Sequence, residues 1–197
     1  MRIGIYGGSF NPPHNMHLKM ATELIRQNLV DKVIFVPTGS KYPKFGLASD
    51  MDRFEMIKLM IDGNPNLEVS DYELKESQIY TYKTLDYFKN YYPKCEIYFI
   101  LGSDLLKDFK TWRNYEYILA NFKILVTLRD TDKKEDLEKI ELPNRENIVY
   151  TNIKLSSLSS TEIREKVEKD DIAFLKQNLD SEVLSYIRKN NLYREDK

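Results

Sequence analysis

Residues 3–17 read IGIYGGSFNPPHNMH, and the rest of the chain can be interpreted outward from this segment. Its apolar start predicts a strand over Ile3–Tyr6, and Gly7 and Gly8 follow that strand directly. Because glycine has no Cβ atom, the backbone at this turn can approach a phosphate closely. The next apolar residues recur at helical spacing, at Leu18, Ala21, Ile25 and Leu29. A helix there would point its N–H groups and positive dipole end at the same anion, so the segment predicts an anion-binding turn.

Both histidines of the protein, His14 and His17, lie in this segment and are three residues apart. On a helix, this spacing places two side chains on one face. Three interpretations fit the pair: a solvated or capping role, a metal site, or paired donors to a phosphate. A metal site needs more ligands, and no cysteine or acidic residue lies nearby in the sequence. The glycine turn favours phosphate donors, although it has neither the G-x-G-x-x-G spacing of dinucleotide-binding turns nor the Gly-Lys-Ser/Thr end of a P-loop.

The remaining chain alternates apolar runs with amphipathic stretches. Five further strands are predicted, over residues 32–36, 67–69, 96–101, 123–127 and 148–150. Helical stripes separate several of these strands, and two or three short helices are predicted from Ser159 onward. This alternation predicts an α/β fold: a Rossmann-like, doubly wound parallel sheet with helices on both faces and a small helical C-terminal segment. Such sheets bind ligands at the carboxyl ends of their strands, and we expect the loops after the first, second and fifth strands to matter most.

The composition excludes several classes of protein. With 197 residues, 30 basic and 31 acidic, the chain carries a net charge of only −1, so no global field draws it to nucleic acid or a membrane. The single cysteine excludes a disulfide framework and a multi-cysteine zinc site. No apolar run approaches the roughly 20 residues of a membrane helix. We expect one cytoplasmic domain over 1–197, with a sheet core over about 1–155 and a helical part over about 156–197. Oligomeric state and partner proteins leave no signal.

Two charged or aromatic stretches are interpreted as structural. Residues 130–141 form a charge run, which predicts a solvated helix or loop without a function of its own. The aromatic stretch over residues 87–92 predicts a core-facing helix instead of a platform for stacking bases. Binding of nucleic acid is therefore not expected.

A second motif, Ser159-Ser160-Thr161-Glu162-Ile163-Arg164, lies near the C-terminal end. Ser159 and Glu162 have the spacing of a capping box, which starts many structural helices. Arg164 would oppose the helix dipole unless an anion lies at the same helix end. A plain helix start and a phosphate cradle therefore both fit the motif.

These segments resemble bacterial nicotinate-nucleotide adenylyltransferases, in the superfamily known by a His-x-Gly-His motif and a late Ser-Ser-Thr-x-Ile-Arg motif. Six ordered segments carry the resemblance over nearly the whole chain: residues 7–12, 35–39, 80–85, 101–104 with Trp112, 126–129 and 159–164. Two positions depart from the family pattern. Met16 stands where the His-x-Gly-His motif has glycine, and Pro43 stands where a Pro-Pro-His-Lys motif has histidine, although Lys44 keeps the lysine.

The resemblance implies transfer of the adenylyl group of ATP to nicotinate mononucleotide, with Mg²⁺ accompanying ATP and pyrophosphate as the other product. Both substrates are small molecules, and no dedicated metal ligand in the protein is implied. The alternatives are another nucleotidyltransferase of this superfamily, with nicotinamide mononucleotide or phosphopantetheine as acceptor, or a nucleotide-binding protein with little turnover.

The resemblance also implies roles for individual residues. The implied catalytic residues are His14, His17, Lys44 and Arg164. The implied ATP-binding residues are Gly7, Gly8, Ser9, Phe10, His14, His17, Gly102, Asp104, Ser159, Ser160, Thr161 and Arg164. The implied residues for nicotinate mononucleotide are Thr81, Tyr82, Trp112 and Arg129, with Trp112 as a stacking surface and the backbone of Thr81 and Tyr82 near the nicotinate carboxylate. From the residues alone, Trp112 could equally be a core side chain, and Gly102 and Asp104 could be a turn that caps a helix.

Overall fold

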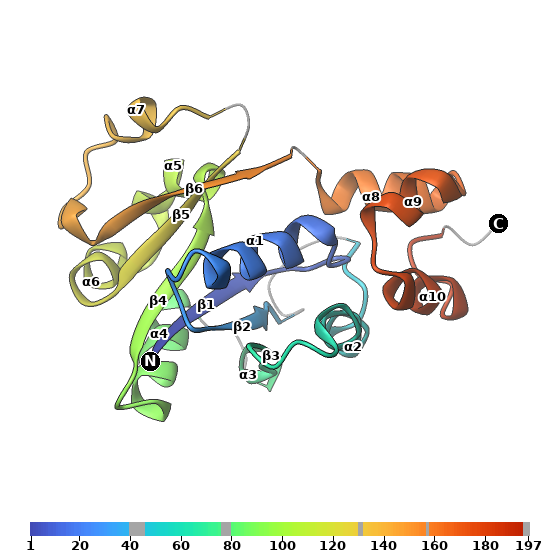
Figure 1. Cartoon of the computed structure of the whole chain (residues 1–197), viewed down its shortest axis with the longest axis horizontal. Helices are drawn as coiled ribbons and strands as arrows, with labels where there is room; N and C mark the ends of the chain where they lie inside the picture. Colours follow the sequence, from blue (N-terminus) through green and yellow to red (C-terminus); the bar gives the residue numbers. More distant parts are fainter. Residues whose placement is uncertain (40–45, 76–79, 130–131, 157, 195–197) are drawn as a thin grey trace.

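The structure, a computed structural model, describes residues 1–39, 46–75, 80–129, 132–156 and 158–194. Six parallel strands form one sheet in the order β3–β2–β1–β4–β5–β6 (Figure 1). Their bounds are β1 (Arg2–Gly8), β2 (Lys32–Pro37), β3 (Leu67–Val69), β4 (Glu96–Gly102), β5 (Lys123–Arg129) and β6 (Ile148–Leu155). The strand order reverses between β1 and β4, so the loops after these two strands flank the switch point where ligands bind in such sheets. The α/β fold class is confirmed, but our choice of loops missed the one after β4.

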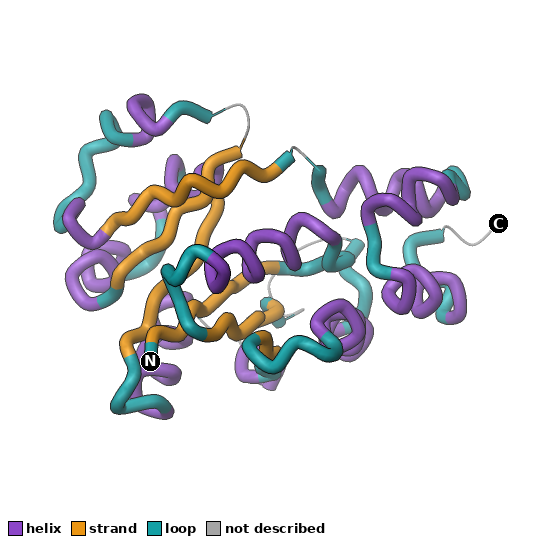
Figure 2. Tube along the Cα trace, in the orientation of Figure 1, coloured by secondary structure: helices purple, strands orange, loops and turns teal. Residues whose placement is uncertain are grey.

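Helices cover both faces of the sheet (Figure 2). The bounds are α1 (Asn15–Arg26), α2 (Asp50–Ile61), α3 (Tyr72–Lys75), α4 (Thr81–Tyr91), α5 (Ser103–Lys107), α6 (Tyr115–Asn121), α7 (Lys134–Leu137), α8 (Ser160–Glu168), α9 (Ile172–Asn178) and α10 (Ser181–Lys189), with 3-10 turns at Phe109–Thr111 and Arg145–Asn147. None of the described helices is both long and apolar enough to cross a membrane.

Alternation along the strands sorts the core into two apolar layers. In β2, Val33 and Phe35 pack on one face of the sheet, whereas Ile34 and Val36 pack on the other. The first layer also contains apolar residues of α1, α2 and the three C-terminal helices, and the second contains those of α4, α5 and α6. Each fully buried side chain of this kind stabilises the fold by about 2 kcal/mol, so both layers are needed to hold the sheet.

The three C-terminal helices gather at one end of the molecule, where β6 leads toward α8 (Figure 1). Ile163, Val167, Leu175, Val183 and Ile187 from these helices are buried in the same layer as α1 and α2. This shared layer supports the single domain expected over 1–197, which stays a prediction.

Several elements differ from the sequence predictions. Strand β6 extends to Leu155, five residues beyond the predicted end, and the short helices α3, α5 and α6 were not predicted. In the aromatic stretch at residues 87–92, Phe88 is buried in the core and the partly buried Tyr87 and Tyr92 pack against it, while the Tyr91 side chain is 63% exposed. The prediction of a core-facing helix here agrees with α4, and only the exposed Tyr91 departs from it, packing on Tyr87 and Tyr92 at the surface.

Candidate active site

Two adjoining cavities open at the carboxyl ends of the strands. The first, here called the His17 cavity, has a volume of 320 Å³ and is lined by His14 and His17, among other residues. The second, the Trp112 cavity, has a volume of 670 Å³. Both cavities are lined by the backbone turn at residues 7–9 and by Leu105. The glycine turn after β1 therefore forms the common wall of a two-part site.

Phe10 fixes the course of the chain after that turn. Its φ of 45° lies in the left-handed region, which a bulky side chain adopts only when its surroundings impose it. The ring is buried and packs edge-on against Tyr6 at 5.3 Å and against the imidazole of His17 at 5.0 Å between ring centroids. Strain at this residue is thus offset by aromatic packing that orients His17.

The two histidines stack on each other at the start of α1. Their ring centroids lie 3.7 Å apart with 25° between the planes. His14 precedes the helix as its N-cap, and its backbone N–H donates to Nδ1 of His17 at 3.1 Å. An Nδ1 that accepts a hydrogen bond leaves the imidazole proton on Nε2. His17 therefore has an Nε2–H donor in a cavity that a phosphate could enter.

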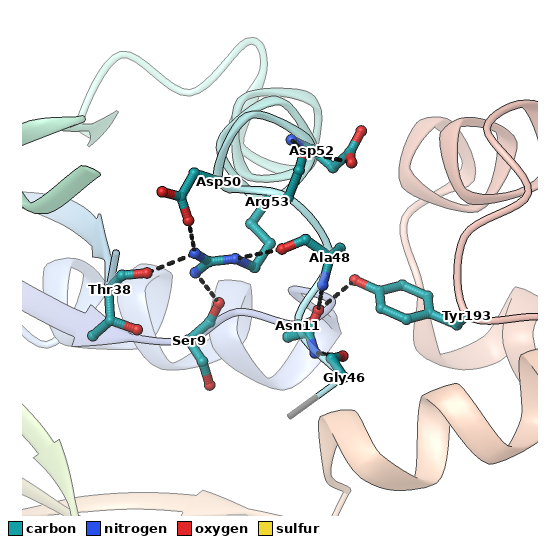
Figure 3. Close-up of polar contacts among 10 residues, drawn as sticks. Ser9, Asn11, Thr38, Gly46, Ala48, Asp50, Asp52, Arg53 and Tyr193 are labelled. Carbon is teal, nitrogen blue, oxygen red and sulfur yellow. Dashed lines mark hydrogen bonds and ion pairs between the residues drawn. The ribbon is translucent and has the colours of Figure 1, made fainter. Parts of the chain in front are cut away.

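Arg53 ties together the loops around the cavities (Figure 3). This arginine on α2 is fully buried, and its guanidinium donates to the carbonyl oxygens of Ser9 at 2.8 Å, Thr38 at 2.6 Å and Ala48 at 3.2 Å. Its charge is paired with Asp50 at 2.6 Å. A buried cation with this many acceptors holds the first loop, the end of β2 and the start of α2 in one arrangement. Sequence reasoning gave no sign of this role.

Asn11 connects the first loop to the C-terminal part of the chain. Its side-chain oxygen accepts hydrogen bonds from the Ala48 backbone N–H and from the hydroxyl of Tyr193, both at 2.9 Å (Figure 3). Its backbone carbonyl accepts from the guanidinium of Arg164 at 2.8 Å. One residue further on, the Pro12 carbonyl accepts from the hydroxyl of Ser160 at 2.8 Å. The two motifs that lie about 150 residues apart in the chain are thus joined directly.

The second motif also forms the Ser159 half of the predicted capping box at the start of α8. The Ser159 hydroxyl is the N-cap and accepts from the Glu162 backbone N–H at 3.1 Å. Ser159 and Ser160 line the His17 cavity. Arg164 donates to the Thr161 hydroxyl at 3.2 Å, so it is held beside the same helix end. A structural cap and a lining role for the His17 cavity therefore coexist in one motif.

The turn after β4 completes the His17 cavity. Gly102 and Asp104 line it, and a Cβ added at Gly102 would lie only 2.5 Å from Oδ1 of Asp104. A side chain at residue 102 would therefore displace the Asp104 carboxylate from its place over this turn. Asp132 accepts hydrogen bonds from Ser103 and Lys107, both at 2.6 Å, and so anchors α5. The described part of the charge run at 130–141 thus supports the site through Asp132, a role that we did not predict.

Trp112 forms one wall of the larger cavity. Its ring is half-buried and packs on Phe109 at 5.1 Å and Phe99 at 5.9 Å between centroids. Thr81 at the start of α4 lines the same cavity, and this helix start has no side-chain cap. Uncapped N–H groups and the helix dipole make such a start a suitable place for a carboxylate. Trp112 is thus both a packing residue and a cavity wall.

Sequence reasoning missed two charged residues of the Trp112 cavity, Glu73 on α3 and Arg113 next to Trp112. The Glu73 carboxylate accepts from the Thr84 hydroxyl at 2.5 Å. Burial raises the pKa of Glu73 to about 7, and the hydrogen bond from Thr84 opposes that rise. Their nearness to Trp112 and to the 80–85 segment was the only signal that could have drawn attention to them.

Most predicted site residues gather at the two cavities. The cavity walls contain Gly7, Gly8, Ser9, Phe10, His14, His17, Gly102, Asp104, Ser159, Ser160, Thr81 and Trp112. Thr161 and Arg164 adjoin the His17 cavity through the contacts given above, and Tyr82 follows Thr81 on α4. Arg129 ends β5. Lys44 and Pro43 lie outside the described residues. Met16, the departure from the family pattern, lines the His17 cavity.

A doubly wound sheet with two histidines after a glycine turn, and a serine-rich helix bonded to Asn11 and Pro12 between them, is the arrangement expected of a nucleotidyltransferase. Residues 5–166 match the model of the cytidylyltransferase-like family, which covers most of the chain. A relative from Clostridium tetani, named "Probable nicotinate-nucleotide adenylyltransferase", is 33% identical, over 96% of this chain and 98% of the relative. A relative of the same name from Caldicellulosiruptor saccharolyticus is 37% identical, over 99% of this chain and 100% of the relative.

Solved structures agree with these matches. The nicotinic acid mononucleotide adenylyltransferase of Plasmodium falciparum, solved in complex with NaAD, is 26% identical. It superposes with a TM-score of 0.82 over 98% of this chain and 97% of its own. The chain belongs to the nicotinate-nucleotide adenylyltransferase family.

Proposed function

We propose that the protein transfers the adenylyl group of ATP to nicotinate mononucleotide, giving nicotinate adenine dinucleotide and pyrophosphate in NAD biosynthesis. The observation that carries the proposal is the pair of cavities that share the glycine turn at residues 7–9. A reaction between two nucleotides needs both substrates side by side, with the reacting phosphates at the common wall. Family membership supports the same reaction. The cytoplasmic location expected from the composition stays a prediction.

For this reaction the protein needs mainly to position the two substrates and to stabilise the charge on their phosphates. A phosphate oxygen of the mononucleotide attacks the α-phosphorus of ATP, and the bond to the β-phosphate breaks to release pyrophosphate. The attacking phosphate monoester has a second pKa near 6, so it is largely a dianion at neutral pH and needs no general base. Donors aimed at the phosphates then account for catalysis.

The His17 cavity would hold the ATP phosphates. The Nε2–H of His17 would donate to the α-phosphate, with His14 stacked beside it. Arg164 and the start of α8 at Ser160 and Thr161 would bind the β- and γ-phosphates, and their bonds to the first loop would hold them there. The turn at residues 7–10 and the Ser159 backbone would line the same nucleotide, with Gly102 and Asp104 near its ribose. We assign Lys44 a supporting contact by resemblance alone.

The Trp112 cavity would hold the mononucleotide. Trp112 would stack on the pyridine ring, and the backbone N–H groups of Thr81 and Tyr82 would bind its carboxylate. Arg129, at the end of β5, is assigned to the same substrate by resemblance.

Mg²⁺ is proposed to arrive with ATP. Among the described residues, no three His, Cys, Asp or Glu side chains are grouped so that they could hold a metal. In such an arrangement Mg²⁺ would be bound mainly by phosphate oxygens and water, as is usual for this ion. When bound, the ion neutralises charge on the departing pyrophosphate.

The test is pyrophosphate release from ATP and Mg²⁺, with nicotinate and nicotinamide mononucleotide measured side by side. Fast release with the nicotinate form is expected, and slower release with the nicotinamide form. Comparable rates would keep the reaction but contradict the role of Thr81 and Tyr82 in reading the carboxylate. No release with either nucleotide, from folded protein that binds ATP, would contradict the proposal.

A further inference from the structure

The Trp112 cavity contains two charged side chains that the reaction does not use. Among the described residues that line it, these are Glu73 and Arg113. They come from different elements, since Glu73 belongs to α3 and Arg113 follows the 3-10 turn at Phe109–Thr111. Nicotinate and nicotinamide mononucleotide differ only in an acid or amide group on the pyridine ring. Charged side chains in the cavity can therefore discriminate between them.

Arg113 is a cation held at the rim. Its side chain is exposed, and the guanidinium carbon lies 5.0 Å from the centroid of the Tyr80 ring. Tyr80 is the N-cap of α4, directly before Thr81 and Tyr82. Cation–π contact thus holds the positive charge against the residue that directly precedes the N–H groups assigned to the nicotinate carboxylate.

Glu73 is a half-buried carboxyl group and, when ionised, carries the charge opposite to that of Arg113. The Thr84 hydroxyl fixes one of its oxygens at 2.5 Å. Its backbone passes close to Gly39 after β2, since a Cβ added at Gly39 would lie 2.6 Å from the Glu73 carbonyl oxygen. With a pKa of about 7, this carboxyl is mostly neutral at pH 6 and mostly ionised at pH 8.

The other charged groups near Glu73 are engaged elsewhere or lie across the cavity. Next to it in the chain, Asp71 just before α3 and Lys75 at its end pair with each other at 2.8 Å. On α4, Asp86 accepts a hydrogen bond from Tyr117, and Lys83 follows Tyr82. Arg113 is the described charge that shares the cavity with Glu73.

We propose that Arg113 and Glu73 tune the preference for the acid over the amide form of the pyridine nucleotide, in addition to the backbone N–H groups of Thr81 and Tyr82, and that this preference depends on pH. This inference rests on the proposed function. Arg113 attracts the nicotinate carboxylate, whereas an ionised Glu73 repels it and accepts a hydrogen bond from the nicotinamide NH₂ group. The preference for the acid form is therefore greatest at low pH and falls as Glu73 ionises.

The experiment measures kcat/KM for nicotinate over nicotinamide mononucleotide at pH 6 to 9. Taking this ratio cancels titration of the 5′-phosphate and of the ATP site, which both substrates share. For the wild type, the ratio is expected to fall about tenfold from pH 6 to pH 9. Glu73→Gln should make the ratio independent of pH, because Gln accepts from Thr84 but does not titrate. Arg113→Gln should lower the ratio about fivefold at every pH.

The controls separate this inference from a loss of folding or of the proposed function. Arg113→Lys should keep most of the wild-type ratio, in contrast to Arg113→Gln. Lys110 is an exposed cation three residues away, and Lys110→Gln should leave the ratio unchanged. Dissociation constants of both nucleotides, measured by calorimetry without ATP, give the same comparison if turnover is absent. A pH-dependent ratio in Glu73→Gln, or an unchanged ratio in Arg113→Gln, would overturn the inference while leaving the reaction intact.

Discussion

The His17 cavity and the Trp112 cavity share a wall but are built differently. The first is formed by helix starts, a glycine turn and two motifs joined through the backbone carbonyls of Asn11 and Pro12. The second is formed by aromatic side chains and by two charges brought in from α3 and from the segment before α6. Phosphate is common to every nucleotide, whereas the pyridine ring is particular to one substrate. The His17 cavity, which joins two motifs at helix starts, therefore suits the invariant phosphate chemistry, and the Trp112 cavity, with its aromatic and charged side chains, suits specificity.

The largest expected effect tests the phosphate side of this comparison. His17→Ala removes an Nε2–H donor and is expected to lower kcat about 10²- to 10³-fold, as loss of one oriented donor typically does. The measurement is steady-state pyrophosphate release under saturating substrates. Lys19→Ala, an exposed change on the same helix, should keep wild-type kcat. A kcat within threefold of wild type for His17→Ala would break the assignment.

A second effect concerns the contribution of Glu73, in the Trp112 cavity, to the stability of the protein. The folded pKa of Glu73 is raised to about 7 from an ordinary 4.5, so the folded state binds more protons than the unfolded state between these values. Stability should therefore fall as pH rises from about 5 to 7.5. Glu73→Gln should lack this loss and gain on the order of 2 kcal/mol over wild type by pH 7.5. Unfolding in urea at several pH values measures the difference, and parallel pH profiles for the two proteins would contradict it.

A third effect tests whether the Trp112 cavity acts on one substrate alone. Trp112→Leu keeps an apolar side chain against Phe109 but loses the stacking surface, so KM for nicotinate mononucleotide should rise about tenfold. KM for ATP should stay within twofold of wild type. Tyr91→Leu, an exposed aromatic change on α4, serves as the matched control. Equal increases in both KM values for Trp112→Leu would contradict the assignment of the Trp112 cavity to the mononucleotide alone.

The smallest effect concerns the link from the C-terminal part to the first loop. Tyr193→Phe keeps the ring but removes the hydroxyl that donates to Asn11. The free energy of unfolding should fall by about 1 kcal/mol, and KM for ATP should rise less than threefold. Urea unfolding and initial rates measure both quantities. An unchanged free energy of unfolding would show that the Asn11 hydrogen bonds do not depend on Tyr193.

The His17 cavity was also the one whose residues the sequence predicted best. Its glycine turn, histidine pair and capping box are local patterns, so their residues could be picked out before any contact was known. Arg53, Glu73 and Arg113 show why the rest could not. A charged residue on an amphipathic helix usually faces water, and only tertiary packing buries Arg53 among three carbonyl oxygens. Short helices such as α3 and α6 have too few residues for a reliable helical period.

The most direct test of the division between the cavities is a paired binding measurement. Dissociation constants of a non-hydrolysable ATP analogue with Mg²⁺, and of nicotinate mononucleotide, would be measured by calorimetry for wild type, His17→Ala and Trp112→Leu. The two-cavity account predicts that His17→Ala weakens binding of the ATP analogue only, and that Trp112→Leu weakens binding of the mononucleotide only. Loss of both affinities in either correctly folded variant would contradict it.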